Sequence, residues 1–271
     1  IMIIGGGIYG CILAIELSKN NNNIILNEKN NDILQETTKY NLWRIHKGYH
    51  YPRCNYTAQL CKKSYKLFYE KYSTCLIKYK HIYCIAKYNS KITTNEYINF
   101  MNHNDLSYNQ ISNLTEFNEN QIDSTFMVDE RLYNISKLNT LITYNLKKQK
   151  IKLNINKEIK EYNNKYCNTI LTSYWNNNNI INNNIIYEYQ ICEVCIIKLP
   201  KNFKNMSITI MDGPFISLNP YGDYFAVYDV KNTILYKETN SSFKIPELYK
   251  EIINKGIINT FKLSKHKLTL E

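Results

Sequence analysis

The sequence predicts an α/β fold in which a nucleotide-binding layer is interleaved with an antiparallel β-rich layer. Two observations carry the prediction. Residues 1–28 read as a strand, a glycine turn, a helix and a second strand. After residue 150, short apolar strands dominate and asparagine-rich loops separate them. Because no Pro-, Gly- or Ser-rich spacer divides the chain, we expect the two layers to share segments that are distant in sequence.

The expected layers alternate along the chain. Residues 1–75 and about 135–175 are expected to form the nucleotide-binding layer. Residues from about 76–134 and 176–245 are expected to form the β-rich layer, which would hold a substrate. Residues 246–271 are expected to form a C-terminal helix and tail.

The first elements follow from apolar patterning. The run Ile1–Ile4 suits a strand buried on both faces, and Ile24–Leu26 is a second such strand. Between them, apolar residues at helical spacing predict a helix. Further helices are predicted over 55–73, 94–101, 136–149 and 246–255. Further strands are predicted over 77–86, 151–155, 157–162, 167–174, 185–198, 206–211, 223–229 and 233–237, with loops at 176–179 and 182–184.

Charge and hydropathy narrow the class of protein. The 34 Lys and Arg exceed the 23 Asp and Glu, which gives a net charge of +11. The lysines are scattered and form no basic stripe, so we expect no nucleic-acid partner. No apolar run approaches the length of a membrane span, and none resembles a signal peptide. We therefore expect a cytoplasmic protein.

Cysteine spacing argues against a metal site. Only Cys192 and Cys195 form a CxxC pair, and both fall in the strand predicted over 185–198. Residues three apart in a strand point to opposite faces, so they cannot easily share one metal ion. We expect reduced thiols and no metal.

A glycine motif gives the most specific functional indication. Gly5, Gly7 and Gly10 form a GxGxxG pattern between a strand and a helix, and Glu28 ends the next strand 18 positions after Gly10. The first glycine permits a tight turn, the second lets a pyrophosphate approach the backbone, and the third allows close helix packing. The helix N-terminus attracts phosphate, and the Glu28 carboxylate suits ribose hydroxyls. The pattern therefore predicts a Rossmann-like dinucleotide site.

Further motifs resemble the FAD-dependent D-amino-acid-oxidase (DAO) superfamily. The glycine motif resembles that of the superfamily, with Ala14, Leu17 and the pair Glu28–Lys29. The segment TTKYNLWRIHKGYHYPR over 37–53 resembles its flavin-contacting loop, and RIHKGYHYPR is similar to a bacterial and viral branch. The resemblance implies an FAD cofactor. It implies cofactor contacts from Gly5, Gly7, Ile8, Tyr9, Gly10, Glu28, Lys29, Thr38, Arg44, His46 and Thr172.

The same resemblance implies oxidation of a C–H bond next to an amine or hydroxyl of a small molecule. His46, His50 and Arg53 are the candidate catalytic residues, because imidazole can accept a proton and guanidinium can clamp an anion. The alternative is that both histidines only fix their loop and that Arg53 is a surface charge. The turn at Asp212–Gly213 is a candidate substrate loop.

Two departures from the superfamily leave alternatives open. Thr172–Tyr174 stands where the superfamily has Ala-x-Gly, and no late glycine-rich turn follows Gly256. We therefore expect a C-terminally truncated chain. The alternatives are a non-catalytic flavin- or nucleotide-binding protein and a redox-neutral flavoenzyme acting on a sugar nucleotide. The sequence leaves the oligomeric state open.

Overall fold

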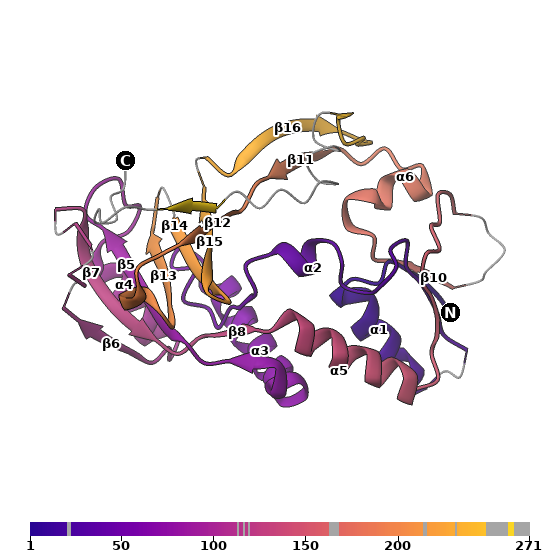
Figure 1. The fold of residues 1–271 in the computed structure, drawn as a ribbon, viewed down its shortest axis with the longest axis horizontal. Helices are drawn as coiled ribbons and strands as arrows, with labels where there is room; N and C mark the ends of the chain where they lie inside the picture. Colours follow the sequence, from indigo (N-terminus) through magenta and orange to yellow (C-terminus); the bar gives the residue numbers. More distant parts are fainter. Residues whose placement is uncertain are drawn as a thin grey trace. The chain divides into compact units, whose positions relative to one another are not determined.

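The computed structural model describes residues 1–20, 23–112, 114–115, 117–118, 120–162, 168–213, 216–230, 232–247 and 260–262. The chain forms two compact units, each built from segments that are far apart in sequence (Figure 1). Unit 1 comprises Ile1–Trp43, Asn134–Ile191 and Tyr236–Asn254. Unit 2 comprises Arg44–Tyr133, Cys192–Leu235 and Lys255–Glu271.

A four-stranded parallel sheet forms the centre of unit 1. Its strand order is β10-β1-β2-β9, from β1 (Met2–Ile4), β2 (Ile25–Asn27), β9 (Lys152–Asn154) and β10 (Thr169–Leu171). Helix α1 (Ile8–Ser18) contacts β1 and β2, and it also packs against α5 (Ile135–Lys148). The small residues Gly10, Cys11 and Ala14 are buried on α1, so the helix can approach closely.

The remaining elements of unit 1 are short. They are α2 (Thr37–Tyr40), η2 (Tyr174–Asn176), α6 (Asn177–Ile181), and the strands β11 (Tyr187–Cys192) and β16 (Ile234–Asn240), which pair in a separate sheet. The loop prediction for 176–179 is wrong. The Asn177 side chain accepts hydrogen bonds from the Ser173 N–H and hydroxyl, and Asn178 Nδ2 donates to two carbonyls. These side-chain bonds stabilise a short helix that asparagine alone disfavours.

The strand predicted over 157–162 is also absent. Strand β9 ends because Asn156 adopts a left-handed backbone with φ +53°. The Lys157 N–H then donates to the Glu28 carbonyl at 2.8 Å, and the Tyr162 N–H donates to the Ile180 carbonyl at 2.8 Å. These bonds join loops and helix ends instead of forming a ladder.

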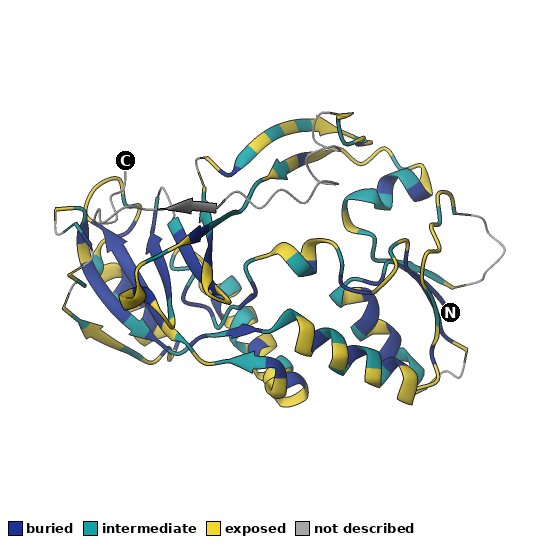
Figure 2. Cartoon of the chain, viewed as in Figure 1, coloured by how far each residue is buried: buried dark blue, intermediate teal, exposed yellow. Residues whose placement is uncertain are grey.

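An eight-stranded mixed sheet forms the centre of unit 2, in the order β17-β12-β15-β14-β13-β5-β7-β6. Its strands are β5 (Lys80–Ala86), β6 (Tyr108–Ile111), β7 (Ile122–Val128), β12 (Cys195–Lys198), β13 (Met206–Met211), β14 (Ile216–Tyr221), β15 (Tyr224–Asp229) and β17 (Thr260–Lys262). Two pairs are parallel, β13 with β5 and β12 with β17. Figure 2 shows β5, β7 and β13 almost wholly buried.

Among its described residues, unit 2 also contains a small antiparallel sheet and four helical segments. Strands β3 (Arg44–Ile45) and β4 (Leu76–Ile77) both pair with β8 (Arg131–Tyr133). The helical segments are α3 (Asn55–Tyr72), η1 (Ser73–Cys75), α4 (Thr94–His103) and η3 (Lys201–Phe203). Helix α4 starts with a capping box in which Thr93 is the N-cap and Glu96 returns the hydrogen bond.

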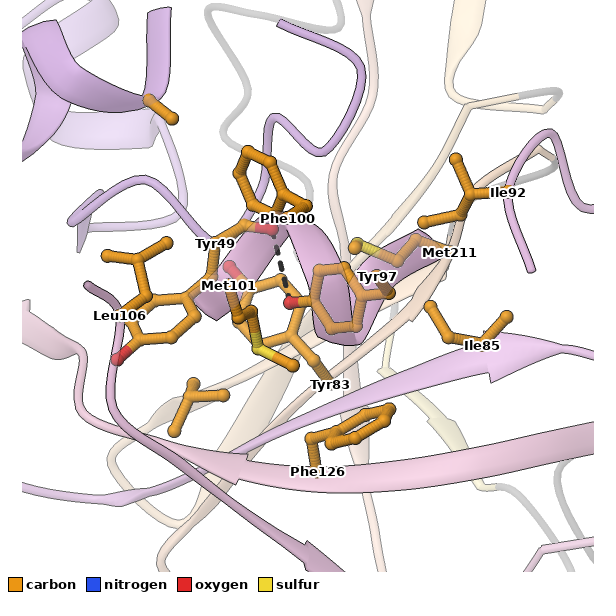
Figure 3. Close-up of a cluster of buried hydrophobic side chains, with 12 residues drawn as sticks. Tyr49, Tyr83, Ile85, Ile92, Tyr97, Phe100, Met101, Leu106, Phe126 and Met211 are labelled. Atoms are coloured by element: carbon orange, nitrogen blue, oxygen red, sulfur yellow. Dashed lines mark hydrogen bonds between the residues drawn. The ribbon is translucent and has the colours of Figure 1, made fainter. Parts of the chain in front are cut away.

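The central sheet of unit 2 presents two different faces. On one face Ile82, Cys84, Ile208, Ile210 and Leu218 lie in an apolar core. On the other face Tyr83, Ile85 and Met211 pack with α4 in a second cluster (Figure 3). This alternation follows from the two-residue period of a strand.

Several strand predictions were incomplete. The single strand predicted over 185–198 is two strands, β11 and β12, with Cys192 on the first and Cys195 on the second. Strands β6, β7, β8 and β14 were not predicted, because polar residues and Pro220 interrupt their apolar pattern. The helix prediction over 246–255 lies outside the described residues from 248 onwards. Among the described residues, no helix is long and apolar enough to cross a membrane.

Candidate functional site

Two positions of the glycine turn in unit 1 have no room for a side chain. Gly5 has φ +110°, and a Cβ there would lie 2.7 Å from the Thr172 carbonyl oxygen. A Cβ on Gly10 would overlap the Gly5 carbonyl oxygen and lie 2.6 Å from Thr172 Oγ1. These two glycines are therefore required for the fold of the turn, as the spacing predicts.

Gly7 is in a different environment. It is the N-cap of α1, it adopts an extended backbone with φ −69°, and it supplies no side-chain cap. The nearest atom to a Cβ on Gly7 would be Thr38 Oγ1 at 3.8 Å. The protein therefore gives no packing reason for a glycine here. The missing Cβ instead leaves a cradle at a helix N-terminus, which is where a pyrophosphate binds.

The side chains of Thr38 and Glu28 accept hydrogen bonds from the backbone around this cradle. Thr38 Oγ1 accepts the Ile8 N–H at 3.2 Å, and both residues were predicted to contact a cofactor. Glu28 is buried directly after β2, where its carboxylate accepts the Gly6 N–H at 2.6 Å and the Asn30 N–H at 2.8 Å. A carboxylate is thus fixed beside the turn at the end of the second strand, the position of the acidic residue in a dinucleotide-binding fold. The residues present fit the diphosphate and ribose of FAD.

Lys29, Tyr9 and Thr172 were also predicted to contact a cofactor. The Lys29 ammonium lies 2.9 Å from a Glu36 carboxylate oxygen and 5.4 Å from the centre of the Trp175 ring. Tyr9 is exposed on α1. Thr172 Oγ1 lies 2.8 Å from the Gly5 carbonyl, so it can donate to the turn from a strand far away in sequence.

The departure at 172–174 includes a residue in a backbone conformation that favours glycine. Tyr174 has φ +57°, in the left-handed region, and its side chain is exposed. A left-handed non-glycine residue costs about 1 kcal/mol.

Arg44 is the hub of a buried polar cluster in unit 2. One guanidinium nitrogen donates to Tyr83 Oη at 3.2 Å and to Thr209 Oγ1 at 2.5 Å. The other donates to Ser207 Oγ at 3.1 Å and to Asn219 Oδ1 at 2.9 Å. Strands β5, β13 and β14 supply these acceptors from one face of the sheet. Arg44 was predicted to contact the cofactor, and the structure places it on protein acceptors.

Glu130 is the counter-ion of Arg44, and sequence reasoning missed it. It lies between β7 and β8 and is fully buried, with Oε2 at 3.9 Å from Arg44 Nε. Tyr83 links the two charges, because its hydroxyl accepts from Arg44 and donates to Glu130 Oε2 at 2.8 Å. Burial alone would raise the pKa of Glu130, but His46 and Arg44 outweigh it and lower the pKa to about 2. No local motif marks this residue.

His46 and His50 lie together beside this cluster. Their ring centres are 4.9 Å apart. Burial, followed by the charges of His46 and Arg44, lowers the pKa of His50 to about 3. Tyr49 fixes the loop between them, since its carbonyl accepts the Tyr97 hydroxyl at 3.2 Å (Figure 3). The structure brings the two predicted histidines to one place.

Arg53 is bound within unit 2. Its Nε lies 2.5 Å from Asp212 Oδ2, and the Arg53 side chain is 54% exposed whereas the Asp212 side chain is 1% exposed. This hydrogen bond and the Asp212 charge raise the pKa of Arg53. The predicted catalytic arginine and the predicted substrate-loop aspartate are therefore partners.

The predicted residues fall into two sets. Unit 1 holds Gly5, Gly7, Ile8, Tyr9, Gly10, Glu28, Lys29, Thr38 and Thr172. Unit 2 holds Arg44, His46, His50 and Arg53. The first set lies in the unit that holds the glycine turn. In the second set, Arg44 forms a buried ion pair with Glu130, His46 and His50 lie beside it, and Arg53 pairs with Asp212.

Together, the parallel sheet and the glycine turn at the start of α1 define an α/β protein with the arrangement of a dinucleotide-binding fold. Residues 1–85 match the family model of the FAD dependent oxidoreductases, named DAO. The FAD-dependent monooxygenase kojA of Aspergillus flavus is 37% identical over 78 residues, which are 29% of this chain and 18% of that protein. The chain thus matches less than a fifth of this curated relative. The predicted resemblance to the DAO superfamily is confirmed over this N-terminal part.

Solved structures extend the likeness to the whole fold. Glycine oxidase from Geobacillus kaustophilus has a TM-score of 0.66 at 11% identity, over 94% of this chain and 76% of that one. L-alpha-glycerophosphate oxidase from Mycoplasma pneumoniae, solved with FAD bound, has a TM-score of 0.65 at 14% identity, with the same coverage. The predicted fold class is therefore confirmed.

Proposed function

We propose that this protein is an FAD-dependent oxidoreductase that oxidises a C–H bond next to an amine or hydroxyl of a small molecule. The observation that carries the proposal is the cradle at Gly7. Of the three motif glycines, it alone has no packing reason to lack a side chain. The family match over residues 1–85 and the fold shared with glycine oxidase support the same activity.

In this proposal unit 1 binds the cofactor. The N-terminus of α1 attracts the pyrophosphate, Gly7 allows its close approach, and Glu28 accepts hydrogen bonds from ribose hydroxyls. Lys29 and Thr38 border the cradle, and Thr172 fixes the turn. Bound FAD supplies the two-electron acceptor.

Unit 2 supplies the polar groups for the substrate. His46 has a side chain that is 29% exposed, and it can accept the proton of a substrate amine or hydroxyl. Arg53 is 54% exposed, so its remaining donors can bind a substrate anion while Nε stays on Asp212. Arg44 holds the polar face of the sheet together and is not assigned to the substrate.

The test is an absorption spectrum of the purified chain after incubation with FAD and desalting. A retained, structured flavin band supports the proposal. Anaerobic bleaching of that band is then measured with glycine, other amino acids and glycerol phosphates, the substrate types that the names of similar structures indicate. A chain that never retains FAD would contradict the proposal, and so would a loaded chain that no amine or hydroxyl substrate reduces.

We further propose a cytoplasmic location. All seven cysteines in the described part of the chain are free thiols, and Cys54 and Cys192 are exposed. Exposed free thiols suit a reducing compartment. Fractionation of cells that express the tagged protein would test this, and recovery in a secreted fraction would contradict it.

A further inference from the structure

Helix α3 carries apolar side chains on two opposite sides. Its inner side consists of Ala58, Tyr65 and Tyr72, which are buried residues of unit 2 at a spacing that keeps them on one face. The opposite side, which we call the outer stripe, consists of Tyr56, Leu60, Lys63 and Leu67. An amphipathic helix normally has polar residues on the side opposite its core. Packing within unit 2 therefore does not explain the apolar residues of the outer stripe.

The apolar members of the outer stripe are exposed. Tyr56 is 79% exposed, and Leu60 and Leu67 are each 51% exposed. They follow the helical spacing of i, i+4 and i+11, so their side chains form one line along about three turns of the helix. A single exposed leucine is ordinary on a protein surface, whereas an aligned set indicates a contact site.

Positive side chains surround this line. The sequence of α3 has four lysines and one acidic residue, Glu70. Lys63 lies within the outer stripe, Lys66 and Lys71 flank it, and all three are exposed. Lys62 lies away from the stripe, where its ammonium donates to the Asn104 carbonyl at 2.8 Å. The outer face of α3 therefore combines exposed leucine and tyrosine with an excess of positive charge.

The charge and size of this face discriminate between its possible occupants. Two copies of the chain that paired through the same face would bring their lysines together, which like-charge repulsion opposes. A standard protein interface buries about 800 Å² on each partner, more than three side chains on one helix supply. An anionic lipid surface meets neither objection, because leucine and tyrosine insert at the headgroup boundary while lysines bind the lipid phosphates.

We propose that the outer stripe of α3 is a docking surface for an anionic lipid membrane. The helix lies in the plane of the membrane interface, with Leu60 and Leu67 inserted and with Lys63, Lys66 and Lys71 at the headgroup phosphates. The contact is peripheral and requires no membrane-spanning segment. It involves α3 of unit 2 alone and needs no cofactor, so its failure and the failure of the proposed function are separate results.

Co-sedimentation of the full chain with lipid vesicles tests the proposal. Vesicles of phosphatidylcholine and phosphatidylserine in equal parts should bind the chain at least about tenfold more tightly than vesicles of phosphatidylcholine alone. Added salt should weaken this binding, because it screens exposed charges. A chain that does not bind the anionic vesicles, or that binds both kinds equally, would overturn the proposal.

Paired lysine variants separate the outer stripe from the positive charge of the whole chain. Lys63→Gln with Lys66→Gln removes two exposed lysines from α3, and Lys147→Gln with Lys148→Gln removes two exposed lysines from α5. The two double variants have the same net charge. Only the α3 variant should lose affinity for the anionic vesicles, by at least about tenfold. Equal losses in both would show that overall charge drives the binding, which would reject the role of α3.

The leucines are tested with a control of the same residue type. Leu60→Ser with Leu67→Ser should lower vesicle affinity at least about tenfold, whereas Leu235→Ser, which changes an exposed leucine of β16, should not. The inner side of α3 is unchanged in the double variant, so the helix should keep its fold, which circular dichroism checks. Wild-type vesicle binding by the folded double variant would exclude the outer stripe as the docking surface. Dimerisation of the wild type in analytical ultracentrifugation that the same double variant abolishes would assign the face to a second copy of the chain and overturn the lipid proposal.

Discussion

Substitution of two glycines by alanine separates cofactor binding from folding. Gly7→Ala adds a methyl group whose nearest neighbour is Thr38 Oγ1 at 3.8 Å, on a backbone that alanine adopts freely. Gly10→Ala adds the same methyl group where it overlaps the Gly5 carbonyl oxygen. The two variants differ from the wild type by the same atoms, so each is the control for the other.

The expected magnitudes follow from these contacts. Gly7→Ala should cost at most about 1 kcal/mol of unfolding free energy, because alanine is a poorer N-cap than glycine. The new methyl group should obstruct the pyrophosphate, so FAD affinity should fall at least about tenfold, or about 1.4 kcal/mol. Gly10→Ala should cost about 3 kcal/mol of stability, because backbone atoms cannot rotate away as a side chain can. Its loss of FAD binding would then follow from the disturbed turn.

Urea unfolding followed by tryptophan fluorescence measures the stability of both variants. Quenching of flavin fluorescence on titration measures FAD affinity. A Gly7→Ala chain that binds FAD as tightly as the wild type would refute the cradle at Gly7. A Gly10→Ala chain of wild-type stability would refute the packing argument at the turn.

Three other substitutions test unit 2. Burial, with the Arg44 charge second, lowers the pKa of His81 from 6.5 to about 3, so its contribution to stability is complete above pH 6.5 and is lost as pH falls towards 3. His81→Phe should therefore reduce the pH dependence of the unfolding free energy in that range by about 1.4 kcal/mol per pH unit. Urea unfolding at pH 5.5 and 4.5 measures this, and an equal change in free energy between the two pH values in wild type and variant would contradict it. Arg44→Lys should destabilise the chain by about 3 kcal/mol, because three ammonium donors cannot serve four acceptors in fork geometry, and a wild-type urea midpoint would exclude this role. Thr93→Ala should cost about 1 kcal/mol by removing the N-cap of α4, whereas Thr93→Ser should cost less, and equal losses would point away from the capping hydroxyl.

The sequence predicted the turns and helices that depend on residues close together in the chain. The glycine turn, α1 and the position of Glu28 follow from a motif of 28 residues, and helix α3 was predicted to within one residue of its C-terminal end. In these segments the sequence contains the residue types that the backbone conformation requires. The predictions failed where side chains supply the stabilising bonds, as in the helix at Asn177, or where polar residues fill one face of a strand, as in β14.

The candidate site shows the same division. The sequence singled out Arg44, His46 and His50, because they lie in one recognisable segment. It gave no indication of Glu130 or of the acceptors on β13 and β14, which lie at least 84 positions away from His46 (130 minus 46). Only the pairing of strands brings such residues within a few ångströms of each other. A single sequence does not predict which distant strands pair.

By itself, then, the sequence determined the dinucleotide turn, because steric limits on glycine and the helix N-terminus act within a few residues. The tertiary structure decided the rest. It placed Thr172 against Gly5, it enclosed Arg44 among hydroxyl and amide oxygens from three strands, and it set Glu130 beside His46. These contacts depend on sheet order and register, which arise from burial of the whole chain and not from any local segment.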